Sequence, residues 1–308
     1  MNEVATFEIG YIQNNAQESV IGISEMPHWI VLSARLTATV LTILLMLHVA
    51  SWSGGKDSTA NIILAHENGE PLDVILFSEV MFSRQENISG EDPDHIRFIY
   101  NVAKPLFESW GYKVEIVRAD VDYLDVFYHK VSRGDGKGKT YGFVLNGLCA
   151  VKRDCKLPPI NDYLESLGDE EIYSYVGIAV DEPTRLESLH KDSHAISLLE
   201  KYNYTEKMAY DLCEKYGLLS PNYFSLGNKR GGCWFCPNAK CREHKKLRAE
   251  NPELWYRFIA LENEPNLWYG KFNCYKPKGE LHRREEQFAW EDAQMSLFDL
   301  EYGDLFAI

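Results

Sequence analysis

The sequence feature that most constrains the fold is the string Ser-Gly-Gly-Lys-Asp-Ser at residues 53–58, which directly follows an apolar segment. Adjacent glycines let backbone amides approach an anion closely, and the N-terminus of a following helix adds a favourable field for negative charge. Lys56 can neutralise a phosphate, Ser53 and Ser58 can donate to its oxygens, and Asp57 can hold Mg²⁺ directly or through water. The spacing excludes a Walker A loop, which has four residues between its first glycine and Gly-Lys. The string therefore predicts a nucleotide-binding loop between a strand and a helix.

Segments of strand and helix character alternate from Met46 onward, which is the pattern of a parallel sheet covered by helices on both faces. We expect four strands, at residues 44–52, 72–78, 113–119 and 172–179. We expect helices at residues 58–67, 93–111, 205–216, 240–250 and 252–262. The sequence thus predicts an α/β fold, a doubly wound parallel sheet followed by a helical subdomain that contains cysteines.

The start of the chain contains a nearly continuous apolar run at residues 29–50, long enough to cross a bilayer. Its last residues also have to form the first strand, so we expect no stable membrane insertion. A chain that began at Met46 would open on that strand. Three interpretations of residues 1–45 follow: an extension that is not native, an added N-terminal helix and, behind these two, a membrane anchor. The predicted units are this extension at 1–45, a nucleotide-binding domain at 46–191, a helical Cys-rich subdomain at 192–283 and an acidic tail at 284–308.

Charge is unevenly distributed along this chain, whose formal net charge is -14. That value argues against nucleic-acid binding over the whole surface. Residues 133–142 form a loop rich in glycine and lysine that is able to close over an anion, and residues 229–248 carry seven Lys or Arg against one acid. These segments indicate an anionic substrate, with nucleic acid as one candidate, although a solvated helix face explains the second segment equally well.

The seven cysteines are an odd number and do not suggest a secreted disulfide framework, so we expect a cytoplasmic protein. Cys233, Cys236, Cys241 and His244 form a C-x2-C-x4-C-x2-H array. Thiolates at this spacing can hold zinc or an iron-sulfur cluster, and the close pair alone can be redox-active. Buried free cysteines in a helical subdomain are the simpler alternative.

The nucleotide loop resembles that of the PP-loop ATP pyrophosphatases, whose sheet is of the adenine nucleotide α-hydrolase-like type. Within that superfamily the chain resembles the phosphoadenosine phosphosulfate (PAPS) reductase-like family, from about Met46 to Glu262. Residues 152–160, Lys-Arg-Asp-Cys-Lys-Leu-Pro-Pro-Ile, are similar to the family's Arg-x-Leu-Lys-x-x-Pro-Ile segment with slightly different spacing. Residues 175–185 are similar to its strand and loop that end in Asp-Glu-Ser and a downstream Arg.

This resemblance implies that ATP and Mg²⁺ bind at the loop, with Lys56 and Asp57 as catalytic residues. The implied ATP-binding residues are Ser53, Gly54, Gly55, Lys56, Asp57 and Ser58. It also implies substrate or phosphate contacts from Lys156, Glu182 and Arg185, for which solvated charges at strand and helix ends are the alternative.

The string Gly-Cys-Trp-x-Cys at residues 232–236 is similar to the cluster region of PAPS reductase-like proteins, including those of bacterial DNA phosphorothioation that carry a [4Fe-4S] cluster. The implied cluster ligands are Cys149, Cys233, Cys236 and Cys241, and Cys155 is a substitute for Cys149 or Cys241. The competing assignment is Zn²⁺ held by Cys233, Cys236, Cys241 and His244.

Two features of the sequence decide which reaction we predict: a C-terminal cysteine motif that is missing and a nucleotide loop that is retained. Authentic PAPS reductases carry a C-terminal Glu-Cys-Gly-(Ile/Leu)-His motif, whereas Cys274 here lies in Phe-Asn-Cys-Tyr-Lys. The loop also keeps Lys56 and Asp57 of the ATP-cleaving form. We therefore expect ATP to be cleaved to AMP and pyrophosphate so that a substrate is adenylated, with sulfur as the later nucleophile. The alternatives are a phosphoadenylyl-sulfate reductase and an ATP-binding accessory protein recruited to DNA.

The tail contains Gln-Met-Ser-Leu-Phe at residues 294–298, which resembles the Gln-x-x-Leu-Phe peptide that binds the bacterial sliding clamp. An extended peptide would place Leu297 and Phe298 in an apolar pocket, with Gln294 as a polar anchor. The alternative is that these apolar side chains pack on the enzyme itself.

Overall fold

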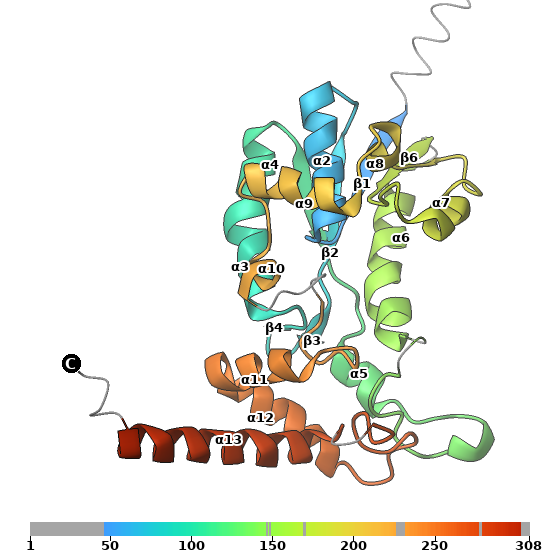
Figure 1. The fold of residues 1–308 in the computed structure, drawn as a ribbon. Coiled ribbons are helices and arrows are strands. Elements are labelled where there is room, and N and C mark those ends of the chain that lie inside the picture. Colours follow the sequence, from blue (N-terminus) through green and yellow to red (C-terminus); the bar gives the residue numbers. More distant parts are fainter. Residues whose placement is uncertain are drawn as a thin grey trace, which may run out of the picture. The chain divides into compact units, whose positions relative to one another are not determined.

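The computed structural model describes residues 46–145, 147, 149–168, 171–225, 232–276 and 279–302, with the side chains of Ser225 and of residues 295–302 excepted (Figure 1). The extension predicted at residues 1–45 lies outside these residues. Among the described helices, none is both long enough and apolar enough to cross a membrane.

One parallel sheet contains the segments that have the strongest strand patterns. Its strands are β1 (Leu47–Trp52), β2 (Val74–Ser78), β5 (Lys113–Val117), β6 (Ile172–Val176) and β7 (Ala195–Ile196). The order across the sheet is β5-β2-β1-β6-β7, and every pairing is parallel. All residues of β2 are buried, as expected for an apolar strand covered on both faces. The predicted α/β fold with a parallel sheet is confirmed.

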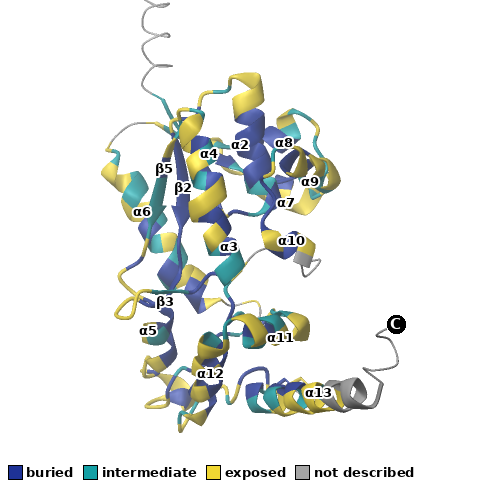
Figure 2. Ribbon diagram, turned by 90° about the vertical axis from the view of Figure 1, so that its left-hand side faces the viewer, coloured by how far each residue is buried: buried dark blue, intermediate teal, exposed yellow. Residues whose placement is uncertain are grey.

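Helices cover both faces of this sheet, as the alternation of side chains along β2 requires. Ile75 and Phe77 point to one face, which is covered by α2 (Lys56–Asn68), α4 (Lys104–Ser109), α8 (Leu198–Lys201) and α9 (Glu206–Lys215). Val74 and Leu76 point to the other, where α6 (Leu157–Ser166) packs. Figure 2 shows β2 and most of α2 as buried. The arrangement is compatible with a doubly wound fold.

Local signals define where several of these helices begin and end. The Asp92 side chain accepts hydrogen bonds from the N–H groups of Asp94 (3.0 Å) and His95 (3.3 Å) at the start of α3 (Pro93–Phe98). The π-helix η2 (Ile99–Ala103) joins α3 to α4, and the chain leaves this helical stretch at Gly111, whose φ is 93°. Thr205 caps α9 as predicted.

A second core, rich in aromatic side chains, lies beyond the carboxyl ends of the strands. It joins the hairpin of β3 (Met81–Ser83) and β4 (Ile88–Ser89) and helix α5 (Tyr123–Tyr128) to α11 (Cys241–Glu250), α12 (Pro252–Ala260) and α13 (Leu281–Tyr302). Trp234 and Phe235 pack against Phe82 in this core. The helices after residue 192 are thus divided, because α8 and α9 belong to the first core and α11 to α13 to the second. Residues 47–308 form one compact unit.

Most of the acidic tail is helical. Residues 294–298, the predicted clamp-binding peptide, belong to the backbone of α13 and are not extended. The side chains of Leu297 and Phe298 lie outside the described residues, so clamp binding stays a prediction.

Candidate functional site

A cavity of about 180 Å³ lies where the sheet changes direction, at the carboxyl ends of β1 and β6. The chain proceeds from β1 outward to β2 and β5, and then returns to β6 and β7 on the other side. In open parallel sheets this switch point is where ligands bind. The cavity is lined by Ser53, Gly55, Asp57, Ser58, Glu91, Lys156, Gly177, Arg185, Tyr223 and Gly232. Four of the six predicted loop residues therefore meet Lys156 and Arg185 in one place, whereas Gly54 and Lys56 are not among the lining residues.

A second, larger groove of about 480 Å³ lies at the end of β5. Its lining includes four carboxylates, from Asp120, Asp125, Asp154 and Asp162, against one arginine, Arg153. The lining of the smaller cavity has two carboxylates, from Asp57 and Glu91, against two cationic side chains, from Lys156 and Arg185. Because carboxylates repel phosphate groups, the excess of negative charge makes the larger groove the poorer site for a nucleoside triphosphate. The smaller cavity is the candidate nucleotide site.

Backbone geometry explains the glycines of the loop. Gly54 has φ 71°, and a Cβ there would collide with the side chains of Ile99 and His95. The Ser58 hydroxyl donates to the Gly55 carbonyl (3.1 Å) and lies 3.1 Å from the Ser53 hydroxyl. These contacts within the loop stabilise its shape.

The buried His95 ties the loop to a distant segment. Its Nε2 lies 3.1 Å from the Ser53 carbonyl oxygen, and its Nδ1 lies 2.9 Å from the Ser220 hydroxyl. Gly177 at the end of β6 fixes the other side, because a Cβ there would lie 2.5 Å from the backbone carbon of Asp57. The start of α2 therefore rests directly on β6.

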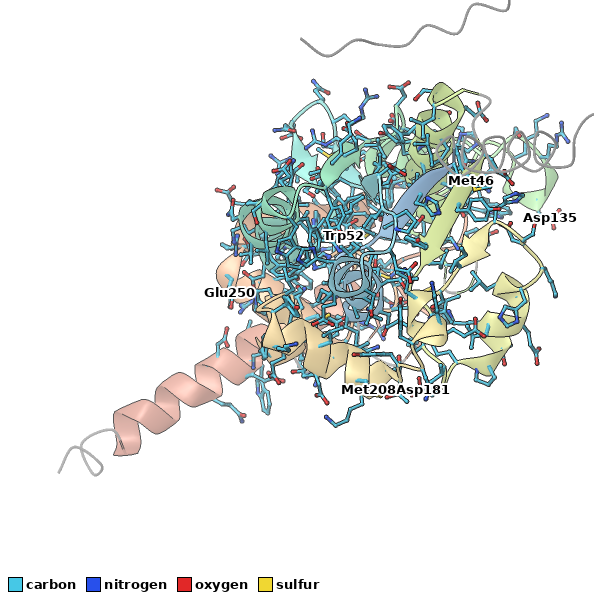
Figure 3. The ribbon with its side chains drawn as sticks, turned by 90° about the horizontal axis from the view of Figure 1, so that it is seen from above. Met46, Trp52, Asp135, Asp181, Met208 and Glu250 are labelled. Atoms are coloured by element: carbon cyan, nitrogen blue, oxygen red, sulfur yellow. The ribbon has the colours of Figure 1, made fainter. Side chains whose placement is uncertain are left out.

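Lys56 lies in an acidic environment. Its Nζ donates to Asp57 (2.7 and 2.8 Å) and to Glu206 (3.0 Å), and its side chain is 9% exposed. Burial opposes the charge, but the hydrogen bonds and charges of Asp57 and Glu206 outweigh it and raise the pKa of Lys56. Glu206 is held in turn, because its backbone N–H donates to the Asp181 side chain (2.9 Å). Figure 3 shows Asp181 beside Met208, which follows Glu206 closely in the chain, although Asp181 itself is distant in sequence.

Three carboxylates around Lys56 have the arrangement of a cation site. Ligand oxygens of Asp57, Glu182 and Glu206 all lie within 4.8 Å of one another. Within the described part of the chain, no other trio of His, Cys, Asp or Glu side chains is gathered so closely. Burial raises the pKa of Asp57, Lys56 opposes this, and the charges of Glu206 and Glu182 add to it. Carboxylate oxygens are the ligands that Mg²⁺ prefers, so the trio fits a magnesium ion.

Two side chains behind the loop had no signal in the sequence. The Tyr223 hydroxyl accepts a hydrogen bond from the N–H of Lys56 (3.1 Å), and the Cys213 thiol donates to the Lys56 carbonyl (3.2 Å). Both side chains are buried, and burial raises the pKa of the Tyr223 hydroxyl. Tyr223 lies in α10 (Pro221–Ser225), far from the loop in sequence. These contacts fix the first residue of α2 at both its amide and its carbonyl.

Two of the three predicted substrate residues line the same cavity, and the third, Glu182, is hydrogen-bonded to one of them. Lys156 ends the π-helix η4 (Lys152–Lys156), where its carbonyl accepts a hydrogen bond from Ser78 (2.9 Å). Arg185 donates to both oxygens of Glu182 (2.6 and 2.7 Å). Lys156 and Arg185 line the cavity, whereas Glu182 belongs to the carboxylate trio.

The predicted metal ligands fall into two groups. Cys233 follows Gly232 of the cavity, and desolvation raises the pKa of its thiol well above the usual range, with Glu91, Cys236 and Cys149 adding and Lys156 opposing. Cys149 and Cys236 are therefore close enough to Cys233 to influence its thiol. Cys241 is exposed at the start of α11, in the surroundings of Arg284 and Lys245.

The neighbouring side chains show two further features. The buried Cys155 has a pKa raised to about 12 by burial, and nearby acids and Cys149 contribute. His244 is buried among Trp255, Phe258 and Phe272, and its Nδ1 accepts a hydrogen bond from Arg284 (2.6 Å). A zinc ion with bonds near 2.3 Å needs thiolates about 4 Å apart, and no three of the described cysteines and histidines lie within 4.8 Å.

Several basic side chains of the segment 229–248 form salt bridges with acidic residues of the same chain. Lys245 pairs with Glu291 (2.6 Å), and Arg248 pairs with Glu285 (2.8 Å) and Asp292 (2.6 Å), all on α13. Lys246 pairs with Asp94 and with Glu250 (2.6 Å). The acidic tail therefore neutralises much of the basic face of α11.

Comparisons with known proteins give a distant relative and no family. No protein-family model matches the chain. Over 223 residues it is 22% identical to an uncharacterized protein of Methanocaldococcus jannaschii, an alignment that covers 70% of this chain and 41% of that protein. The chain thus spans well under half the length of this relative. Fold and site together define an α/β protein with a cavity suited to phosphate at the switch point of its sheet.

Proposed function

We propose that this chain is a PP-loop enzyme of the PAPS reductase-like kind, which cleaves ATP between the α and β phosphates and transfers AMP to an acceptor. The observation that carries the proposal is the meeting of the Ser53–Ser58 loop with Lys156 and Arg185 at one cavity, whose lining residue Asp57 also belongs to the carboxylate trio. A phosphate chain needs amide donors, cations and a metal ion in one place, and the cavity offers residues for each.

The residues have separate roles in this reaction. An oxygen of the acceptor forms a bond to the α-phosphorus, the bond from that phosphorus to the bridging oxygen breaks, and its electron pair leaves with pyrophosphate. The loop amides with Ser53 and Ser58 orient the phosphates, while Lys56, Lys156 and Arg185 stabilise the charge that moves onto pyrophosphate. Asp57, Glu182 and Glu206 are the residues that would hold Mg²⁺. Bound there, the ion supplies charge neutralisation for the leaving group.

Sulfur transfer to the adenylated acceptor is the second part of the proposal. Gly232 lines the cavity, so the adjacent Cys233 places a thiol beside the nucleotide site. Cys149, Cys233 and Cys236 would hold an iron-sulfur cluster with Cys241 or Cys155. A cluster there would supply a site for binding sulfur. The check is iron and sulfide analysis of anaerobically purified protein: we expect both elements and a broad visible absorption that Cys233→Ala removes, whereas stoichiometric zinc in a colourless sample would contradict this part.

Nucleotide binding is tested without knowledge of the acceptor. Calorimetry with α,β-methylene-ATP and MgCl₂ should show one site per chain, and Lys56→Ala should abolish it. Lys246→Ala is the matched control, because it also removes a lysine held by two carboxylates, outside the cavity. Retained binding in Lys56→Ala would contradict the proposed site.

Cleavage is tested by separating the products of ATP incubated with the protein and candidate acceptors. AMP and pyrophosphate are expected, and both Lys56→Ala and Asp57→Ala should eliminate them while leaving the fold intact. ADP and phosphate as products would contradict the proposed bond cleavage.

A further inference from the structure

One wall of the nucleotide cavity differs in chemistry from the rest. Ser53, Ser58, Lys156, Arg185 and Tyr223 present hydroxyl groups or positive charge, which suit phosphate oxygens. Glu91 lines the same cavity with a carboxylate. It is 4% exposed, and its buried Oε1 accepts no hydrogen bond from any described residue. Buried acceptors in native proteins nearly always have a partner, so such an orphan inside a binding cavity points to a ligand.

The carboxylate is held in place by its backbone. The Glu91 N–H donates to the Ser89 hydroxyl (3.3 Å), and Glu91 forms an antiparallel bridge with Cys233. The next residue extends this contact, because the Asp92 N–H donates to the Gly232 carbonyl (3.2 Å). Glu91 therefore lies on the wall formed by the cysteine segment, and it is not a member of the carboxylate trio around Lys56.

We propose that Glu91 selects the acceptor of the reaction by accepting a hydrogen bond from an N–H or O–H group of that molecule. A phosphate or a carboxylate placed against Glu91 would meet like charge in a desolvated cavity, which is strongly unfavourable. The acceptor is therefore a neutral or cationic molecule with a hydrogen-bond donor close to its reacting oxygen, and carboxylic acids are excluded. This inference rests on the proposed nucleotide site.

Two matched probes test it. Adenosine 5′-phosphoramidates that carry either a carbamoylmethyl or a carboxymethyl group on nitrogen have nearly the same size and share the phosphoramidate N–H. They differ at the end of the substituent, where one offers the N–H donors of a neutral carboxamide and the other a negative carboxylate. We expect the wild-type protein to bind the carbamoyl probe at least about tenfold more tightly than the carboxymethyl probe. One hydrogen bond to a charged group changes an affinity by about this factor. Glu91→Gln should bring the two affinities to within about twofold. Glu86→Gln is the control, because it removes an exposed carboxylate that pairs with Arg257 outside the cavity.

The outcomes separate the inference from the proposed function. Equal affinities, or a preference of the wild-type protein for the carboxymethyl probe, would overturn the role of Glu91 while leaving nucleotide binding intact. A preference that survives in a folded Glu91→Gln variant would do the same. Failure of ATP and of both probes to bind would overturn the proposed function itself, and this inference with it.

Discussion

Replacing Lys56 by methionine tests whether the carboxylates around it form a cation site. The change removes the charge between Asp57 and Glu206, which lie 2.7 and 3.0 Å from Nζ. These two carboxylates of the trio then lose their ammonium partner, whereas Glu182 keeps its pairing with Arg185. Removing one partner of a fully buried ion pair costs about 3–5 kcal/mol. The side chain of Glu206 is 47% exposed, which screens part of this, so we expect a loss of about 2 kcal/mol in the free energy of unfolding.

The assay is thermal unfolding with EDTA and with increasing MgCl₂. In EDTA the midpoint of Lys56→Met should fall by about 5 °C. Magnesium at one hundred times its dissociation constant should restore about 2.7 kcal/mol, because the freed carboxylates then bind it. Lys246→Met is the control: Lys246 also bridges two carboxylates, those of Asp94 and Glu250, but they lie outside the trio, so Mg²⁺ should not restore it. Equal rescue of both variants, or none of Lys56→Met, would refute the reasoning.

Three further predictions concern the surroundings of the loop. Gly177→Ala places a Cβ 2.5 Å from the Asp57 backbone and should lower the free energy of unfolding by about 2 kcal/mol. Gly232→Ala, whose Cβ meets no atom of the described residues within 4 Å, should leave urea unfolding unchanged. Tyr223→Phe removes the acceptor of the buried Lys56 N–H and should cost about 1 kcal/mol and weaken nucleotide binding; unaltered calorimetric affinity would assign Tyr223 to the fold alone. Burial raises the pKa of Asp57, so nucleotide binding that depends on Mg²⁺ should disappear on acidification at a higher pH than for an ordinary aspartate. Glu206→Gln removes a charge that adds to this shift and should move the loss to lower pH; a stationary midpoint would contradict the assignment.

The parts of the fold that follow from local patterns were predictable from the sequence. β1, β2 and α2 flank the loop where the apolar runs and the glycines indicate them, because strand, turn and helix signals there agree. The helix α6 was missed, because prolines at 158 and 159 break the periodic pattern; they lie in its first turn, where proline is tolerated. The hairpin of β3 and β4 was missed because its strands are very short.

The candidate site was predictable only in its local part. The loop residues form one continuous string, and Lys156 and Arg185 were expected through a family resemblance. Glu206 and Tyr223 lie 150 and 167 residues beyond Lys56 in sequence, and no local pattern marks them. Tertiary packing alone brings them to the loop, through α9 against α2 and α10 against α3.

The charges around Lys56 explain why nucleotide and metal would depend on each other. Before a ligand binds, the ammonium group is held by Asp57 and Glu206, the carboxylates that form the cation site with Glu182. Lys56 therefore cannot turn fully to a phosphate unless another cation compensates these carboxylates, and a metal cannot reach them while Lys56 occupies them. Under the proposed function, a nucleotide that arrived with Mg²⁺ would satisfy both conditions, because the phosphates would accept Lys56 and the carboxylates would accept the metal. An ion pair that weakens the binding of each ligand alone would then favour binding of the two together.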